Sequence, residues 1–175
     1  MGPRAHGAPG HARLQERIRQ HLRDCGAEVR DMPFRFKTSR DPEPVAFNNI
    51  LGRFKGKSDR WVLIGTHYDT RLWADVDPDP ARHDEPIEGA NDGGSGTAVL
   101  LEIATVLKER QPPVGVELVF FDGEDYGRAG SDDYFIGSRA LAQAWPQIYG
   151  SRPDVALVLD MVGDADLLFA KEAMA

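Results

Sequence analysis

The chain has 175 residues, of which 41% are hydrophobic and 28% charged, and this composition suits one soluble globular domain with a core of its own. Its 28 acidic and 21 basic residues give a net charge of -7, which excludes nucleic-acid binding as the main role because that binding needs a basic surface. The single cysteine, Cys25, excludes an intrachain disulfide and a thiolate-rich zinc site.

Two kinds of targeting signal are also absent from the sequence as written. No apolar run approaches the roughly 18 residues of a membrane span. The N-terminus, which begins Met1-Gly2-Pro3-Arg4, lacks the apolar stretch of a signal peptide. We therefore expect no membrane span.

The predicted helices and strands alternate along the chain. Leu14, Ile18 and Leu22, spaced four residues apart, predict a helix with one buried stripe over residues 13–23. Apolar runs bounded by turn residues predict six further elements: strands over 47–54 and 61–66, a helix over 96–110, a strand over 116–121, a helix over 138–145 and a strand over 155–159. This alternation favours an α/β sheet with parallel members.

Acidic or imidazole side chains follow three of these strands. His67, the pair Glu124 and Asp125, and Asp160 each come after an apolar strand, and Asp92 lies in a glycine-rich segment. Because ligands collect at the carboxyl ends of parallel strands, we expect these side chains to share one edge of the sheet. Removing these charged groups from water costs several kcal/mol per ion unless a nearby positive charge or a proton compensates. A bound metal ion is the simplest source of that positive charge.

The adjacent acids Glu124 and Asp125 divide two tasks. Neighbouring side chains point in different directions, so one can bind a metal while the other faces a substrate. Metal-assisted hydrolysis or acyl transfer needs this pairing of a Lewis acid with a general base.

Residues 71–88 form a long segment without periodicity. Loops of this length are usually functional or disordered, and we interpret this one as the rim of an active site because both its ends adjoin candidate metal ligands. Its run from Asp75 to Asp79 resembles the start of a calcium loop, but Pro80 and Pro86 stand where that motif needs glycine and glutamate.

The order of five motifs resembles that of the zinc aminopeptidases and glutaminyl cyclases. Three cues make the bacterial glutaminyl cyclase branch the nearest: Gly2-Pro3-Arg4 with Gly7-Ala8-Pro9-Gly10-His11 before the first helix, the segment Arg71–Asp75, and Gly-Glu-Asp-Tyr instead of the Glu-Glu-x-Gly of aminopeptidases. The motifs are His67-Tyr68-Asp69-Thr70, Gly89-Ala90-Asn91-Asp92-Gly93-Gly94-Ser95-Gly96, Phe121-Asp122-Gly123-Glu124-Asp125-Tyr126-Gly127, Gly137-Ser138-Arg139 and Leu159-Asp160-Met161-Val162-Gly163.

This resemblance implies a fold and an activity. The implied fold is an α/β three-layer sandwich, with a mostly parallel mixed central sheet flanked by helices, as a single domain over 1–175 that lacks its C-terminal part. The implied activity is that of a zinc-dependent glutaminyl-peptide cyclotransferase, which converts N-terminal glutamine to pyroglutamate with release of ammonia. The substrates would be peptide or protein N-termini, and the resemblance also suggests an exported or periplasmic protein. A zinc aminopeptidase and a non-catalytic binding module remain as alternatives, and the oligomeric state stays open.

The resemblance also assigns roles to residues. Asp92 and Asp125 resemble the zinc carboxylates, and Glu124 resembles the general acid/base. His67 and Asp160 match ligands of the second metal in two-zinc aminopeptidases. In one-zinc cyclases the same two residues would support the site or face the substrate, and Asp160 would stabilise the intermediate by hydrogen bonding.

Two expectations concern the surroundings of these residues. Asp69 would orient His67 through a ring nitrogen. The family pattern has a further histidine ligand well downstream, which we do not find before Ala175. Catalytic zinc normally has three protein ligands, so we expect this chain to bind zinc weakly and to turn over little substrate. The histidines that do not match the downstream motif are His6, His11, His21 and His83.

Overall fold

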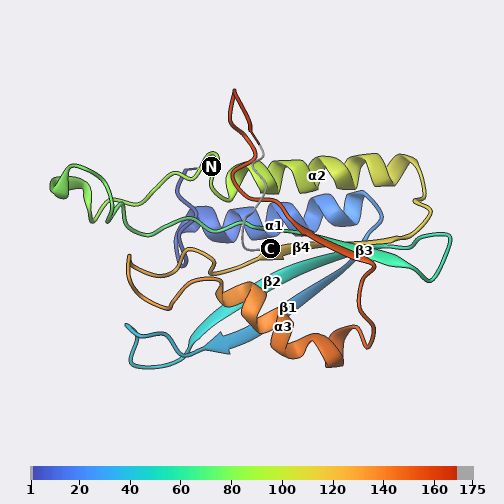
Figure 1. Cartoon of the computed structure of the whole chain (residues 1–175), viewed down its shortest axis with the longest axis horizontal. Helices are drawn as coiled ribbons and strands as arrows, with labels where there is room; N and C mark the ends of the chain where they lie inside the picture. Colours follow the sequence, from blue (N-terminus) through green and yellow to red (C-terminus); the bar gives the residue numbers. More distant parts are fainter. Residues whose placement is uncertain (1, 169–175) are drawn as a thin grey trace.

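The computed structural model describes residues 2–168. Within them, the predicted helices and strands follow one another in the predicted order, with one additional strand (Figure 1). In chain order the elements are α1 (Pro9–Asp24), β1 (Glu28–Phe36), β2 (Val45–Phe54), β3 (Trp61–His67), the 3-10 turn η1 (Pro80–Arg82), α2 (Gly94–Glu109), β4 (Gly115–Phe121), α3 (Ile136–Ile148) and β5 (Val155–Val158).

The five strands form one mixed sheet in the order β1-β2-β4-β3-β5. β3 is parallel to both of its neighbours, β4 and β5, whereas β2 pairs antiparallel with β1 and β4. In the register of β3 with β4, His67 stands opposite Phe121, the last residue of β4. The carboxyl ends of these two strands therefore meet at the same edge of the sheet.

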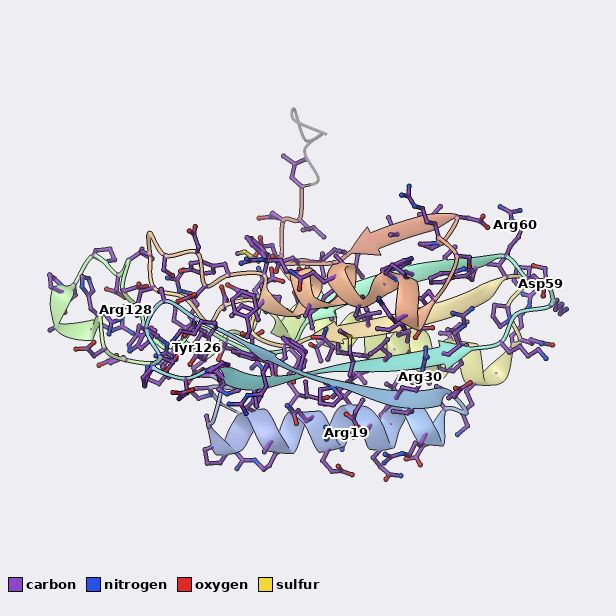
Figure 2. The ribbon with its side chains drawn as sticks, turned by 90° about the horizontal axis from the view of Figure 1, so that it is seen from below. Arg19, Arg30, Asp59, Arg60, Tyr126 and Arg128 are labelled. Carbon is purple, nitrogen blue, oxygen red and sulfur yellow. The ribbon has the colours of Figure 1, made fainter. Side chains whose placement is uncertain are left out.

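Helices cover both faces of the sheet. Leu118 on β4 packs with residues of α1 and α2, whereas its neighbour Val119 packs with Leu141 of α3, because successive strand side chains point to opposite faces. Figures 1 and 2 show α3 on the opposite side of the sheet from α1. The predicted three-layer α/β sandwich is thereby confirmed. The single domain over 1–175 and its missing C-terminal part stay predictions.

Every predicted helix and strand is present, but one strand was not predicted. β1 mixes charged and apolar residues and contains Pro33, and an internal proline argues against a strand because it cannot donate to the ladder. The fold tolerates Pro33 because β1 lies at the edge of the sheet and pairs only with β2. Among residues 2–168, no helix is both long and apolar enough to cross a membrane.

Candidate functional site

All five predicted site residues lie at the carboxyl edge of the parallel strands. His67 ends β3, Glu124 and Asp125 follow β4, Asp160 follows β5, and Asp92 precedes α2 by two positions. In Figure 2 this end of the molecule is marked by Tyr126 and Arg128, far from Asp59 and Arg60 at the opposite end of the strands. The parallel register thus brings together residues that are distant in sequence.

The four acidic side chains lie around the ring of His67. Its Nε2 atom lies 2.9 Å from Asp92 Oδ1 and 3.4 Å from Asp160 Oδ1. Two sets of three can each present ligand atoms within 4.8 Å of one another: His67 with Asp92 and Asp125, and His67 with Glu124 and Asp160. We refer to these five residues together with Asp69 as the acid cluster.

Asp69 contacts both the His67 ring and the loop after β4. It is 1% exposed, and one of its oxygens lies 3.4 Å from His67 Nδ1, the contact that sequence analysis predicted. Its two oxygens also accept hydrogen bonds from the backbone N–H groups of Glu124 (3.1 Å) and Asp125 (3.0 Å). Asp69 therefore orients both the ring and the loop that carries the candidate general acid/base.

Glycine at position 93 allows the start of α2 to approach β3. Gly93 has a φ of +67°, a conformation that other residues rarely adopt. A Cβ atom there would lie 2.6 Å from the carbonyl oxygen of Asp69 and 2.9 Å from the His67 ring. Only glycine places Asp92, the preceding residue, this close to His67.

Arg4 joins the two segments on either side of the long loop. Its side chain donates hydrogen bonds to the carbonyl oxygens of Tyr68 (3.1 Å), Glu88 (2.9 Å) and Gly89 (2.6 Å), and its backbone N–H donates to Thr70 Oγ1 (2.9 Å). This guanidinium is almost fully buried. Sequence analysis used the Gly-Pro-Arg motif only for the resemblance and missed this contact.

Burial and mutual repulsion shift the pKa values of the acid cluster. Burial opposes protonation of His67, but the carboxylates of Asp69 and Asp92 outweigh it and raise the pKa of His67 to about 11. Burial, with the charges of nearby aspartates, raises the pKa of Glu124 to about 7 and raises that of Asp125 as well. The close contact with His67 lowers the pKa of Asp92. The cluster thus carries excess negative charge and retains protons near neutral pH.

The donor atoms of the cluster fit a divalent cation. Among the described residues, both ring nitrogens of His67 and Asp125 Oδ2 are buried without a well-aligned hydrogen-bond partner. Imidazole nitrogen and carboxylate oxygen are ligands that zinc accepts. A cation bound to Asp92, Asp125 and the His67 nitrogen that faces Asp92 would satisfy that nitrogen and the buried Asp125 oxygen, and it would offset part of the negative charge.

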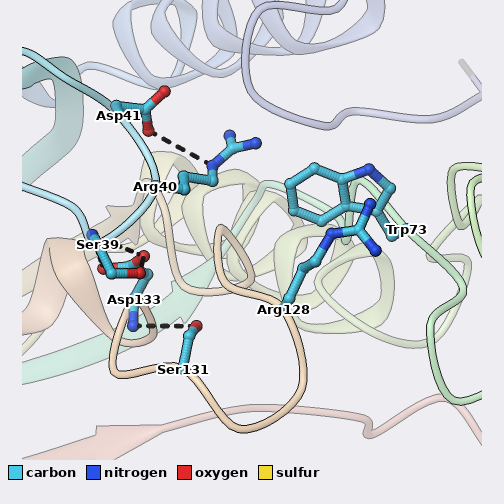
Figure 3. Close-up of a pocket in the computed structure, with 7 residues that line it drawn as sticks. All are labelled: Ser39, Arg40, Asp41, Trp73, Arg128, Ser131 and Asp133. Atoms are coloured by element: carbon cyan, nitrogen blue, oxygen red, sulfur yellow. Dashed lines mark hydrogen bonds and ion pairs between the residues drawn. The ribbon is translucent and has the colours of Figure 1, made fainter.

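One residue of the long loop, Trp73, lines a cavity. The cavity has a volume of about 410 Å³ (Figure 3), and Trp73 of the loop lies in it with the guanidinium groups of Arg40 and Arg128 4.5 and 4.1 Å from its ring centre. Tyr126, directly after Asp125, connects this cavity to the acid cluster, because its hydroxyl donates to Asp41 of the cavity wall (2.7 Å). The lining residues are Ser39, Arg40, Asp41, Trp73, Arg128, Ser131 and Asp133.

Comparison with known proteins gives consistent matches. The family described as peptidase family M28 matches residues 49–172. A glutaminyl-peptide cyclotransferase of Drosophila melanogaster is 30% identical over 95% of this chain and 46% of its own length. Among solved structures, a Bacteroides thetaiotaomicron glutaminyl cyclase bound to N-acetylhistamine has a TM-score of 0.90 and 33% identity, over 99% of this chain and 61% of that one.

A peptidase structure is nearly as similar. A Zn-dependent exopeptidase from Parabacteroides distasonis has a TM-score of 0.84 and 33% identity, over 93% of this chain and 57% of that one. The chain spans about half the length of the curated relatives it matches. Sequence and fold comparison therefore lead to the same group of proteins.

Proposed function

The chain belongs to peptidase family M28, and from this premise we propose that the whole protein is a zinc-dependent glutaminyl-peptide cyclotransferase. One observation carries the proposal: a possible metal-binding group, His67 with Asp92 and Asp125, lies beside a glutamate that keeps a proton near neutral pH. The similarity to glutaminyl cyclases over almost the whole chain supports this reaction over others that the site could perform.

The reaction forms one bond and breaks one. The α-amine of an N-terminal glutamine attacks its own γ-amide carbon, a five-membered lactam closes, and ammonia leaves. Zinc held by His67, Asp92 and Asp125 would supply a Lewis acid for the γ-carbonyl. The substrates would be the N-termini of peptides or proteins.

Glu124 would carry the proton in this reaction. Its carboxylate accepts a proton from the attacking amine and then donates it to the departing ammonia. A general acid/base works best when its pKa is close to the working pH, and the pKa of about 7 for Glu124 meets that condition. The backbone of Glu124 is held by Asp69 (3.1 Å), which keeps the carboxylate in place between the two transfers.

Asp160 would hold the intermediate. It lies in the same group as Glu124 and His67, and its side chain is 45% exposed, so it can reach a bound substrate. As an acceptor it would bind the nitrogen that becomes part of the ring.

The similarity to a Zn-dependent exopeptidase favours a second candidate function. In an aminopeptidase the same Glu124 would take a proton from water as that water attacks the first peptide bond. The two reactions use the same residues and differ in their products.

A product assay separates the two functions. A peptide with N-terminal glutamine is incubated with the chain and with a longer product of the same coding region, with and without a chelator. Ammonia release with loss of 17 Da supports the cyclase, a free amino acid supports the peptidase, and no chelator-sensitive product from either protein argues against both. Glu124→Gln should abolish the activity, whereas exposed Glu109→Gln should retain it. We also propose export, which fractionation of the source cells would test.

A further inference from the structure

A second group of metal-ligand side chains lies apart from the acid cluster and shares no residue with it. It consists of His6, His11 near the start of α1, and Asp122 directly after β4, and these side chains can present ligand atoms within 4.8 Å of one another. His11 Nε2 is 2.7 Å from Asp122 Oδ1. Sequence analysis assigned no function to this group, because its members are up to 116 positions apart.

Aromatic rings pack against both histidines of the group. The ring of His6 lies 4.6 Å from that of Phe47 and 5.4 Å from that of Tyr126, and Tyr68 stacks on His11 at 5.2 Å. A polar atom that is buried among these rings needs a partner, because leaving it unpaired costs free energy.

One polar atom of this group has no such partner. Nδ1 of His6 is buried and accepts or donates no hydrogen bond within residues 2–168. The ion pair between His11 and Asp122 accounts for two of the three groups but leaves this atom unsatisfied. A third interaction is needed to explain why His6 points an imidazole nitrogen into the protein.

Burial favours the neutral form of one donor group, and a hydrogen bond fixes the position of another. Burial lowers the pKa of His6, which favours the neutral imidazole that binds metals. Asp122 is 1% exposed, and its second oxygen accepts the backbone N–H of Asn48 (2.9 Å). That hydrogen bond fixes the carboxylate in the way that outer-sphere partners orient metal ligands.

We propose that His6, His11 and Asp122 bind one divalent transition-metal ion of the zinc type. Two imidazoles and one carboxylate suit such an ion, and magnesium and calcium prefer oxygen ligands. The ion would replace the shared proton between His11 and Asp122 and give His6 its missing partner. It would also link the N-terminal segment to the end of β4, one residue before the Gly123-Glu124 turn of the candidate active site.

Metal titration tests the proposal in a background that lacks the other candidate site. His67→Gln/Asp92→Asn/Asp125→Asn removes the ligand that both sets of the acid cluster share, together with two carboxylates, and leaves the proposed group intact. Calorimetric titration with ZnCl2 should still detect about one ion per chain. Adding His6→Gln should lower the zinc affinity at least ~10-fold, because one of three protein ligands is lost. Adding His83→Gln, in the long loop, should leave it unchanged.

Three results would overturn the proposal: no zinc binding by the background protein, equal affinity with and without His6→Gln, or loss of binding with His83→Gln. A second measurement needs no change at the site. In the background protein, ZnCl2 should shift the ring resonances of His6 and His11 together in NMR spectra, and unshifted rings would contradict the proposal. Neither measurement uses enzymatic activity, so failure of the proposed function would not affect the result.

Discussion

Two regions of the same sheet bury carboxylates in opposite ways. Glu117, in the middle of β4, is fully buried, and two arginines reach it: Arg30 at 3.3 Å and Arg53 at 3.0 Å. At the end of that strand, one imidazole, His67, faces five carboxylates within the acid cluster. The protein neutralises the buried acid whose role is structural, and it leaves the acids at the strand ends in excess, as a cation-binding site requires.

The pKa values express the same contrast. Burial raises the pKa of both Glu117 and Glu124. At Glu117 the nearby arginines oppose this rise in pKa. At Glu124 the neighbouring aspartates add to the rise, and the main opposing influence is the charge of His67. Substitutions that remove charge should therefore have opposite effects on stability in the two regions.

The largest expected effect follows from removing both cations around Glu117. Arg30→Leu/Arg53→Leu leaves a buried carboxylate without compensation and should lower the free energy of unfolding by about 2–4 kcal/mol. Urea denaturation at pH 7 measures this loss. Adding Glu117→Gln should recover part of it, because no buried charge then remains. A loss below about 1 kcal/mol would show that the arginines are not needed.

Removing a charge from the acid cluster should have two separable results. Asp125→Asn should lower zinc affinity ~10- to 100-fold, because it removes a ligand. The same substitution should raise the stability of the metal-free protein by up to about 1 kcal/mol, because it relieves repulsion among carboxylates. Zinc titration measures the affinity, and urea denaturation in the presence of a chelator measures the stability of the metal-free protein. Asp132→Asn, at an exposed position outside the cluster, is the control, and a destabilised Asp125→Asn would contradict the contrast between the regions.

The stability of the metal-free protein should depend on pH through Glu124. Its pKa rises from 4.5 to about 7 on folding, so between these values the folded state binds more protons than the unfolded state. The contribution of Glu124 to stability then falls as pH rises from about 4.5 to 7 and is constant above that. The expected loss is about 1–2 kcal/mol after allowance for partial exposure. Glu124→Gln should flatten the slope, and an unchanged slope would assign it to another group.

The acid cluster and the contact of Asp69 with His67 were predictable from sequence, whereas the contacts of Arg4 and His11 were not. Apolar runs identify β3 and β4, and parallel pairing then places His67 and Glu124 at one edge of the sheet. The support from Arg4 depends on side-chain contacts across 64 to 85 positions, and the His11–Asp122 pair spans 111. Local periodicity contains no information about which distant groups such side chains reach.

Arg4 offers the mildest test of how the acid cluster is held. Its planar guanidinium donates to the carbonyl oxygens of Tyr68, Glu88 and Gly89. A lysine keeps the positive charge, but its single ammonium group cannot donate to all three oxygens at once. Arg4→Lys should lower zinc affinity ~3- to 10-fold, because the segment carrying Asp92 loses its anchor to the His67 segment. Arg13→Lys, on the exposed face of α1, controls for the loss of an arginine. A structural role alone would lower stability and leave zinc affinity unchanged, and that outcome would remove Arg4 from the candidate site.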